Sequence, residues 1–71
     1  MQATKDFSLV LHNGKVVFIG SRKDATKKLL ENRDATDVMH TYLEGAEFDF
    51  GMYGKETESK LIEQGYIKEQ R

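Results

Sequence analysis

The chain has 71 residues, of which 38% are hydrophobic and 32% are charged, and its formal net charge is −1. A chain of this length buries only about 60% of the surface that its unfolded form exposes, so we expect one small α+β domain over residues 1–71 and no enclosed active site. It contains no Cys, which excludes disulfides and thiolate zinc sites, and no apolar run of membrane-spanning length. These features predict a cytoplasmic, non-enzymatic protein without cofactor or metal.

Residues 7–20 carry the clearest local signal. Two β-prone runs, 7–12 and 15–20, flank the dipeptide Asn13-Gly14. Asn-Gly tolerates the positive φ values that a two-residue type I′ turn requires, so the pattern predicts an antiparallel hairpin. Both faces of the second run are apolar, which predicts a hairpin that is central or covered on both sides.

The next segment, residues 22–32, predicts a helix. Ser21 or Asp24 suits its N-cap, and Asn32 suits its end. Its apolar positions fall on one side, and its lysines fall on the other. The apolar side consists of Ala25, Leu29 and Leu30.

Residues 34–44 predict a second helix, because five apolar residues follow the i, i+3, i+4, i+7, i+8 spacing. Asp34 or Thr36 would open it, and Gly45 would close it. Its Val, His, Thr and Tyr residues are indifferent helix formers, so a strand stays open as the alternative. The apolar residues are Ala35, Val38, Met39, Tyr42 and Leu43.

The stretch AEFDFGMYG, residues 46–54, alternates with period two and predicts a half-buried strand. Phe48, Phe50 and Met52 share one face of that strand. Glu47, Asp49, Gly51 and Tyr53 share the other. Residues 56–64 then predict a closing helix, with acids in its first turn and Gly65 at its end.

In chain order these elements read ββααβα, a small antiparallel sheet packed with two or three helices. An internal echo supports a different interpretation. NGKVVFIGSRKDATKKLLEN and EGAEFDFGMYGKETESKLIEQ share a turn, a strand and a similar helix end. If the echo is a duplication, the order becomes ββα-ββα, and Val38–Leu43 is a strand.

Charge divides the chain. Residues 1–33 hold seven bases and three acids, whereas residues 34–71 hold four bases and nine acids. On a strand Glu47 and Asp49 would project together at a spacing of about 6.6 Å. An acidic row of this kind suits a basic protein surface and imitates the repeating phosphates of a nucleic acid. The alternative is the ordinary polar side of an edge strand. The acidic and aromatic face comprises Glu44, Glu47, Asp49, Tyr53, Glu56 and Glu58.

A basic cluster on the first helix supports a second hypothesis, binding of nucleic acid through phosphate neutralisation. Against it, the chain is not basic overall, and the NRDA connection lacks the Gly-containing turn of a helix-turn-helix. The cluster comprises Arg22, Lys23, Lys27, Lys28 and Arg33.

Two weaker patterns concern metal binding and catalysis. On a helix, Asp37, His40 and Glu44 would share one face, but exposed helices produce such triplets by chance, so we expect no metal site. Neither His12 nor His40 has a nucleophile setting nearby in the sequence.

No motif identifies a family. In style, a Cys-free and Pro-free chain dense in Lys and Glu resembles the small accessory proteins of bacteriophages and other mobile elements, which commonly bind and inhibit a host protein. The first hypothesis is therefore a non-enzymatic modulator or inhibitor of a larger, basic, nucleic-acid-binding host protein, bound through the acidic and aromatic face. A strand at residues 47–53 that lay at a sheet edge would also allow two copies to pair as a homodimer.

Overall fold

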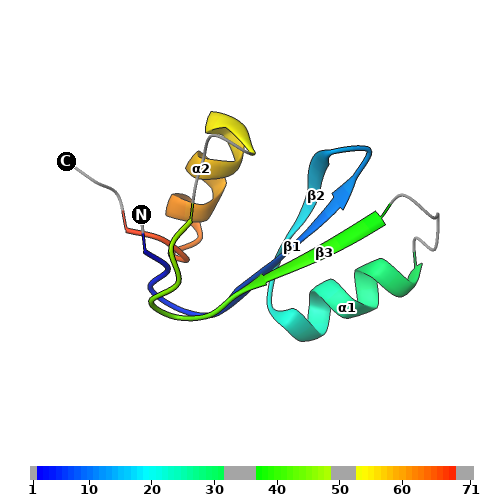
Figure 1. The fold of residues 1–71 in the computed structure, drawn as a ribbon, viewed down its shortest axis with the longest axis horizontal. Helices are drawn as coiled ribbons and strands as arrows, with labels where there is room; N and C mark the ends of the chain where they lie inside the picture. The colour runs from blue at the N-terminus through cyan, green and yellow to red at the C-terminus, as the bar shows by residue number, and fades with distance from the viewer. Residues whose placement is uncertain (1, 32–36, 49–52, 69–71) are drawn as a thin grey trace. The chain divides into compact units, whose positions relative to one another are not determined.

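The computed structural model describes residues 2–31, 37–48 and 53–68. They form three antiparallel strands in an open sheet and two helices, which confirms a small α+β fold. The elements are β1 (Phe7–His12), β2 (Lys15–Gly20), α1 (Arg22–Glu31), β3 (Asp37–Tyr42) and α2 (Gly54–Glu63) (Figure 1).

The chain divides into two compact units. Phe7–Thr41 form the hairpin unit, and Met1–Asp6 with Tyr42–Arg71 form the terminal unit. The expectation that all 71 residues form one domain stays a prediction.

The predicted hairpin opens the hairpin unit. Asn13 and Gly14 have φ values of 52° and 77°, as a type I′ turn requires. β1 pairs with β2 from Ser8 opposite Gly20 to His12 opposite Lys15. The register shifts between Val10 and Leu11, which places a bulge in β2. The hairpin prediction is confirmed.

The sheet has the order β2-β1-β3, so β1 is central and β2 is an edge of the described sheet. Two side-chain contacts join β1 to β3. The hydroxyls of Ser8 and Thr41 are 3.0 Å apart, and His12 Nδ1 contacts Asp37 Oδ1. In both pairs the residue numbers change in opposite directions, as antiparallel strands require.

The prediction of a helix over residues 34–44 is wrong, because β3 (Asp37–Tyr42) occupies most of the described part of that segment. The alternative interpretation placed a strand there. Within β3 only Met39 is a strong helix former, and the central strand β1 offers a row of backbone hydrogen bonds that a helix would leave without partners. The order among the described elements is therefore ββαβα, and neither ββααβα nor the full duplication is reproduced.

α1 forms at the predicted position and packs against β1 and β2. The prediction that Leu30 belongs to its buried apolar side is wrong, because Leu30 is 57% exposed. The backbone N–H of Asp24 donates to Ser21 Oγ at 3.2 Å, which confirms Ser21 as the N-cap. Thr26 Oγ1 donates to Met39 Sδ at 3.8 Å, so α1 covers the sheet face that carries Met39. Within α1, Ala25 is fully buried. The fully buried apolar residues of the sheet are Phe7, Leu9 and Val10.

In the terminal unit, α2 forms where the closing helix was predicted. It ends in a Schellman motif: the N–H of Gly65 donates to the Ile62 carbonyl at 3.0 Å, and that of Tyr66 donates to the Leu61 carbonyl at 2.9 Å. Gly65 has φ of 78°, a left-handed conformation that favours glycine.

The N-terminal segment ties the terminal unit together. The N–H of Ala3 donates to the Ala46 carbonyl at 2.9 Å, and the N–H of Thr4 donates to the Tyr66 carbonyl at 2.8 Å. Isolated bridges pair Gln2 with Glu47 and Ala3 with Ile67. The buried apolar residues of this unit are Ala3, Phe48, Leu61 and Ile67.

Of the strand predicted at residues 47–53, Glu47 forms only an isolated bridge. Asp49, Phe50, Gly51 and Met52 lie outside the described residues. Across residues 2–31, 37–48 and 53–68, no helix combines the length and apolar character needed to cross a membrane.

Candidate partner-binding surface

An aromatic cluster in the terminal unit consists of Tyr42, Phe48 and Tyr53. Phe48 is buried, and its ring meets Tyr42 edge to face, with the ring centroids 5.1 Å apart. The Phe48 ring also stacks on the Tyr53 ring, with the ring centroids 5.4 Å apart. The hydroxyls of Tyr42 and Tyr53 are 3.1 Å apart. Burial raises the pKa of Tyr42 above its ordinary value, and the hydrogen bond and charge of Tyr53 raise this pKa further.

Tyr53, which the predicted strand places on its acidic side, is half-buried in this cluster. Thr57, which is buried in the first turns of α2, donates from Oγ1 to the Tyr53 carbonyl at 3.0 Å. The Tyr53 side chain is therefore held by internal contacts and is only partly accessible to a partner. Its role in binding stays a prediction.

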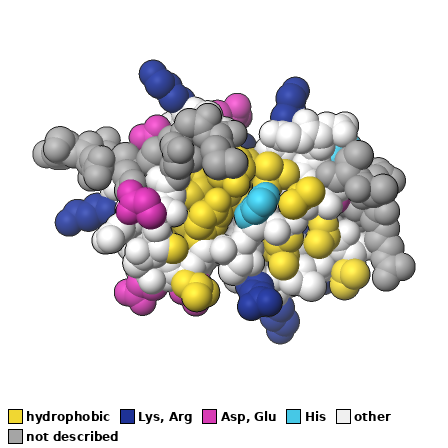
Figure 2. Space-filling model, viewed as in Figure 1, with side chains coloured by type: hydrophobic (Ala, Val, Ile, Leu, Met, Phe, Trp, Pro, Cys, Tyr) yellow, Lys and Arg dark blue, Asp and Glu magenta, His cyan; other side chains and the backbone are white. Residues whose placement is uncertain are grey.

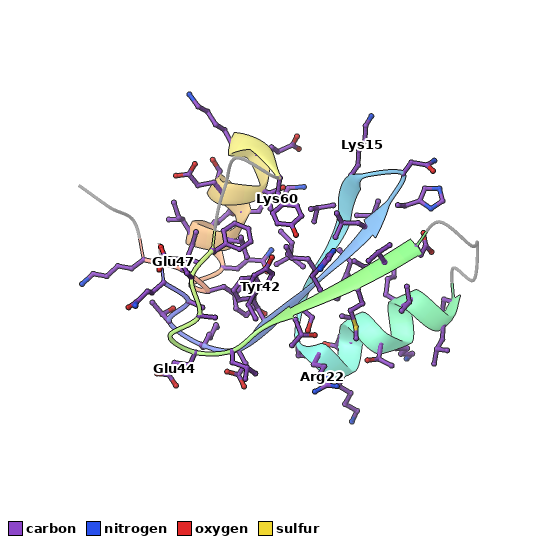
Figure 3. The ribbon with its side chains drawn as sticks, viewed as in Figure 1. Lys15, Arg22, Tyr42, Glu44, Glu47 and Lys60 are labelled. Atoms are coloured by element: carbon purple, nitrogen blue, oxygen red, sulfur yellow. The ribbon has the colours of Figure 1, made fainter. Side chains whose placement is uncertain are left out.

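Glu44 and Glu47 lie on the segment that joins β3 to Phe48 (Figure 3), and both are exposed. The backbone of this segment is fixed at several points. The N–H of Glu44 donates to Asp6 Oδ1 at 2.7 Å, and the N–H of Gly45 donates to the Ala3 carbonyl at 2.8 Å. The two carboxylates thus extend from an ordered turn.

Two acids of the predicted face, Glu56 and Glu58, lie on α2 and differ in their exposure. Glu56 is 88% exposed and lies 3.7 Å from Lys60, four residues along the helix. Exposed i, i+4 pairs contribute only about 0.3–0.5 kcal/mol, so this pair screens Glu56 without holding it firmly. Glu58 is half-buried. Asp49, the remaining acid of the predicted face, lies outside the described residues.

Formal charge separates along the structural division. The terminal unit contains eight acids and five bases, a net charge of −3, and the hairpin unit contains four acids and six bases, a net charge of +2. On the face drawn in Figure 2, acidic side chains gather over the part that contains α2. The described acids of the predicted face all belong to the terminal unit.

The basic cluster belongs to the hairpin unit. Arg22, Lys23 and Lys27 are exposed on α1, and Arg22 extends outward from the first turn (Figure 3). Lys28 is half-buried, and Arg33 lies outside the described residues. The acidic and basic candidates therefore occupy different units.

The Asp37, His40 and Glu44 triplet loses its common face, because a strand sends Asp37 and His40 to opposite sides. No group of three or more His, Cys, Asp or Glu side chains is placed to hold a metal ion in the described ranges. Asp37, whose side chain is 4% exposed, instead contacts His12, which is 38% exposed. This pair was not anticipated, since 25 residues separate its members and no local pattern connects them.

No protein-family model, curated protein or solved structure matches this chain.

Proposed function

We propose that the chain is a non-catalytic protein-binding domain that modulates or inhibits a larger partner with a basic surface. The contact is the acidic face of the terminal unit, centred on Glu44 and Glu47. The observation that carries the proposal is the exposure of both carboxylates on a turn whose backbone is held by Asp6 and Ala3. A preordered turn loses little conformational entropy on binding.

Electrostatics make this face suited to basic partners. The terminal unit has a net charge of −3, so a basic protein approaching it is attracted before contact is made. Glu56 and Glu58 on α2 extend the acidic character, and Asp49 and the accessible part of Tyr53 are proposed to complete it. A nucleic-acid-binding host protein is the proposed class of partner, since its groove is built to accept negative charge.

The test is a capture experiment with tagged protein and nuclease-treated cell lysate. Bait carrying Glu44→Lys and Glu47→Lys is compared with wild type, and bound proteins are identified by mass spectrometry. We expect a basic protein that wild type retains and the double variant loses. Because both side chains are exposed, the variant is expected to keep its circular dichroism spectrum and melting temperature.

A matched control carries Glu31→Lys and Glu63→Lys, which change the net charge by the same amount at exposed positions outside the proposed face. This control is expected to retain the partner. If both double variants capture the same proteins as wild type, the acidic face is not the contact. If both lose the partner equally, the contact depends on net charge alone.

A second candidate function is nucleic-acid binding by α1. It is favoured by Arg22, Lys23 and Lys27, which are exposed and make no ion pair within the described residues. Free cations on one helix are the feature that phosphate contacts need. The predicted result is a salt-sensitive mobility shift with duplex or single-stranded nucleic acid, which Lys27→Glu with Lys28→Glu abolishes. Absence of any shift at low salt would eliminate this candidate.

A further inference from the structure

Two leucines are the most exposed large hydrophobic residues in the described part of the chain. Leu43 is 61% exposed in the terminal unit, and Leu30 is 57% exposed on α1. A single exposed leucine requires no explanation. Leu43 has glutamates nearby, whereas Leu30 has lysines nearby, so the charges around the two leucines have opposite sign.

Leu30 lies beside two lysines of α1, and the exposed Glu31 follows it in the chain. Lys27 and Lys23 precede Leu30 by three and seven residues, so the three side chains follow one side of α1. Both lysines are exposed and make no ion pair within residues 2–31, 37–48 and 53–68. This side of α1 is the basic leucine surface.

Leu43 lies among acids. Glu44 follows it directly, and Glu47 is four residues along the chain. The N–H of Ala46 donates to the Leu43 carbonyl at 2.8 Å, which closes the turn on itself. With the bonds to Asp6 and Ala3, this presents an apolar side chain and two carboxylates on one ordered segment, the acidic leucine turn.

We infer that the acidic leucine turn of one copy docks on the basic leucine surface of a second copy. The inference rests on the proposed function, because it names a second copy of this chain as one basic partner of the acidic face. Leucine meets leucine at the centre, and lysines meet glutamates at the rim, the usual arrangement of a protein interface. Each copy carries both surfaces, so one such contact is enough to join two copies.

Each contact is small, which places the dimer among weak and transient assemblies. Interfaces that bury less than about 1,200 Å² dissociate readily, and exposed ion pairs are screened by salt. We therefore expect a monomer–dimer equilibrium that shifts toward monomer on dilution and at high salt. Binding of a host protein to Glu44 and Glu47 would compete with the dimer.

Sedimentation equilibrium of the full chain tests the inference. Wild type is expected to form dimers, and Lys23→Glu with Lys27→Glu, or Glu44→Lys with Glu47→Lys, is expected to yield monomers. An equimolar mixture of these two double variants is expected to recover a heterodimer, since every rim contact is again attractive. Failure of the mixture to associate, or wild type that is monomeric at all concentrations, would overturn the inference.

Charge-neutral variants separate docking from general attraction between oppositely charged proteins. Leu30→Asn and Leu43→Asn keep the net charge and are each expected to weaken wild-type dimerisation at least tenfold. Unchanged dimerisation in both would show that the leucines do not form the contact, and would overturn the inference.

Sedimentation and lysate capture test the dimer and the proposed function separately. A monomeric wild type that still captures a basic host protein through Glu44 and Glu47 refutes the dimer and leaves the proposed function standing. A salt-sensitive dimer with no host protein captured supports the inference and counts against the proposed function.

Discussion

Removing the contact between His12 and Asp37 tests the position of β3 most sharply. Asp37 has a side chain only 4% exposed, and His12 Nδ1 is its partner across the sheet. We predict that His12→Ala and Asp37→Ala each destabilise the fold, and that the double variant loses less than the sum. A hydrogen bond to a charged group contributes about 1.5–3 kcal/mol, and the partial exposure of His12 favours the lower end of that range.

The coupling energy is measured by urea denaturation of wild type, both single variants and the double variant. A folded chain of 71 residues has a stability of about 4–11 kcal/mol, so a coupling of about 1–2 kcal/mol is measurable. The matched control pairs Asp37→Ala with His40→Ala. On a helix these residues would be neighbours at i, i+3, whereas β3 places them on opposite faces, so their effects should add.

Refutation would come from a His12–Asp37 coupling below about 0.3 kcal/mol, or from a larger coupling between Asp37 and His40. The first result would mean that Asp37 of β3 does not contact His12 of β1. The second would restore the helix that spacing alone predicts for residues 34–44.

Three further predictions concern the terminal unit. Gly65→Ala should lower the free energy of unfolding by about 1 kcal/mol, because Gly65 has φ of 78° while no atom obstructs a Cβ; an unchanged urea midpoint would contradict the Schellman cap. Phe48→Ala should cost about 3–5 kcal/mol, since Phe48 is 2% exposed between two tyrosines, and a loss below about 1 kcal/mol would contradict its place in the core. Burial raises the folded-state pKa of Tyr42 above its ordinary 10.0, so its contribution is complete below pH 10.0 and is lost as the pH rises above that value. Tyr42→Phe should therefore reduce the alkaline loss of stability in urea titrations, and an identical loss in both proteins would argue against the raised pKa.

Local signals predicted the parts of the fold that local interactions determine. Asn13-Gly14 favours its turn because both residues accept positive φ values. Ser21 caps α1 by accepting a hydrogen bond from the backbone N–H of Asp24, three residues along the chain. Gly65 ends α2 in the left-handed conformation. Each of these signals acts within a few residues, so no tertiary information is needed to interpret it.

The segment that forms β3 could not be assigned in this way. Val38, Met39 and Tyr42 fit helical spacing and do not alternate as the apolar residues of a half-buried strand would. The choice depends on β1, whose free edge lies about 30 residues away in sequence and supplies the hydrogen bonds. Distant contacts of this kind, including His12 with Asp37, leave no local periodicity.

For the candidate site, sequence patterns anticipated the exposed acids but not the burial of Tyr53. Glu44, Glu47 and Glu56 are exposed, as charged residues usually are. Tyr53 is half-buried because Phe48 and Tyr42 supply a stacking surface and a hydroxyl partner. These contacts bring Phe48 and Tyr53 to Tyr42 at the end of β3, and the alternation of residues 46–54 does not specify that arrangement.

The most direct test of the acidic face is the affinity of the captured host protein for three forms of the chain: wild type, Glu44→Lys with Glu47→Lys, and the matched control Glu31→Lys with Glu63→Lys. We predict at least a tenfold loss for the first double variant, equivalent to about 1.4 kcal/mol, and a change of less than about twofold for the control. The loss should shrink as salt is added, because screening weakens attraction and repulsion alike. Equal affinity for all three forms would contradict the account and leave the acids of the terminal unit as a solvated surface.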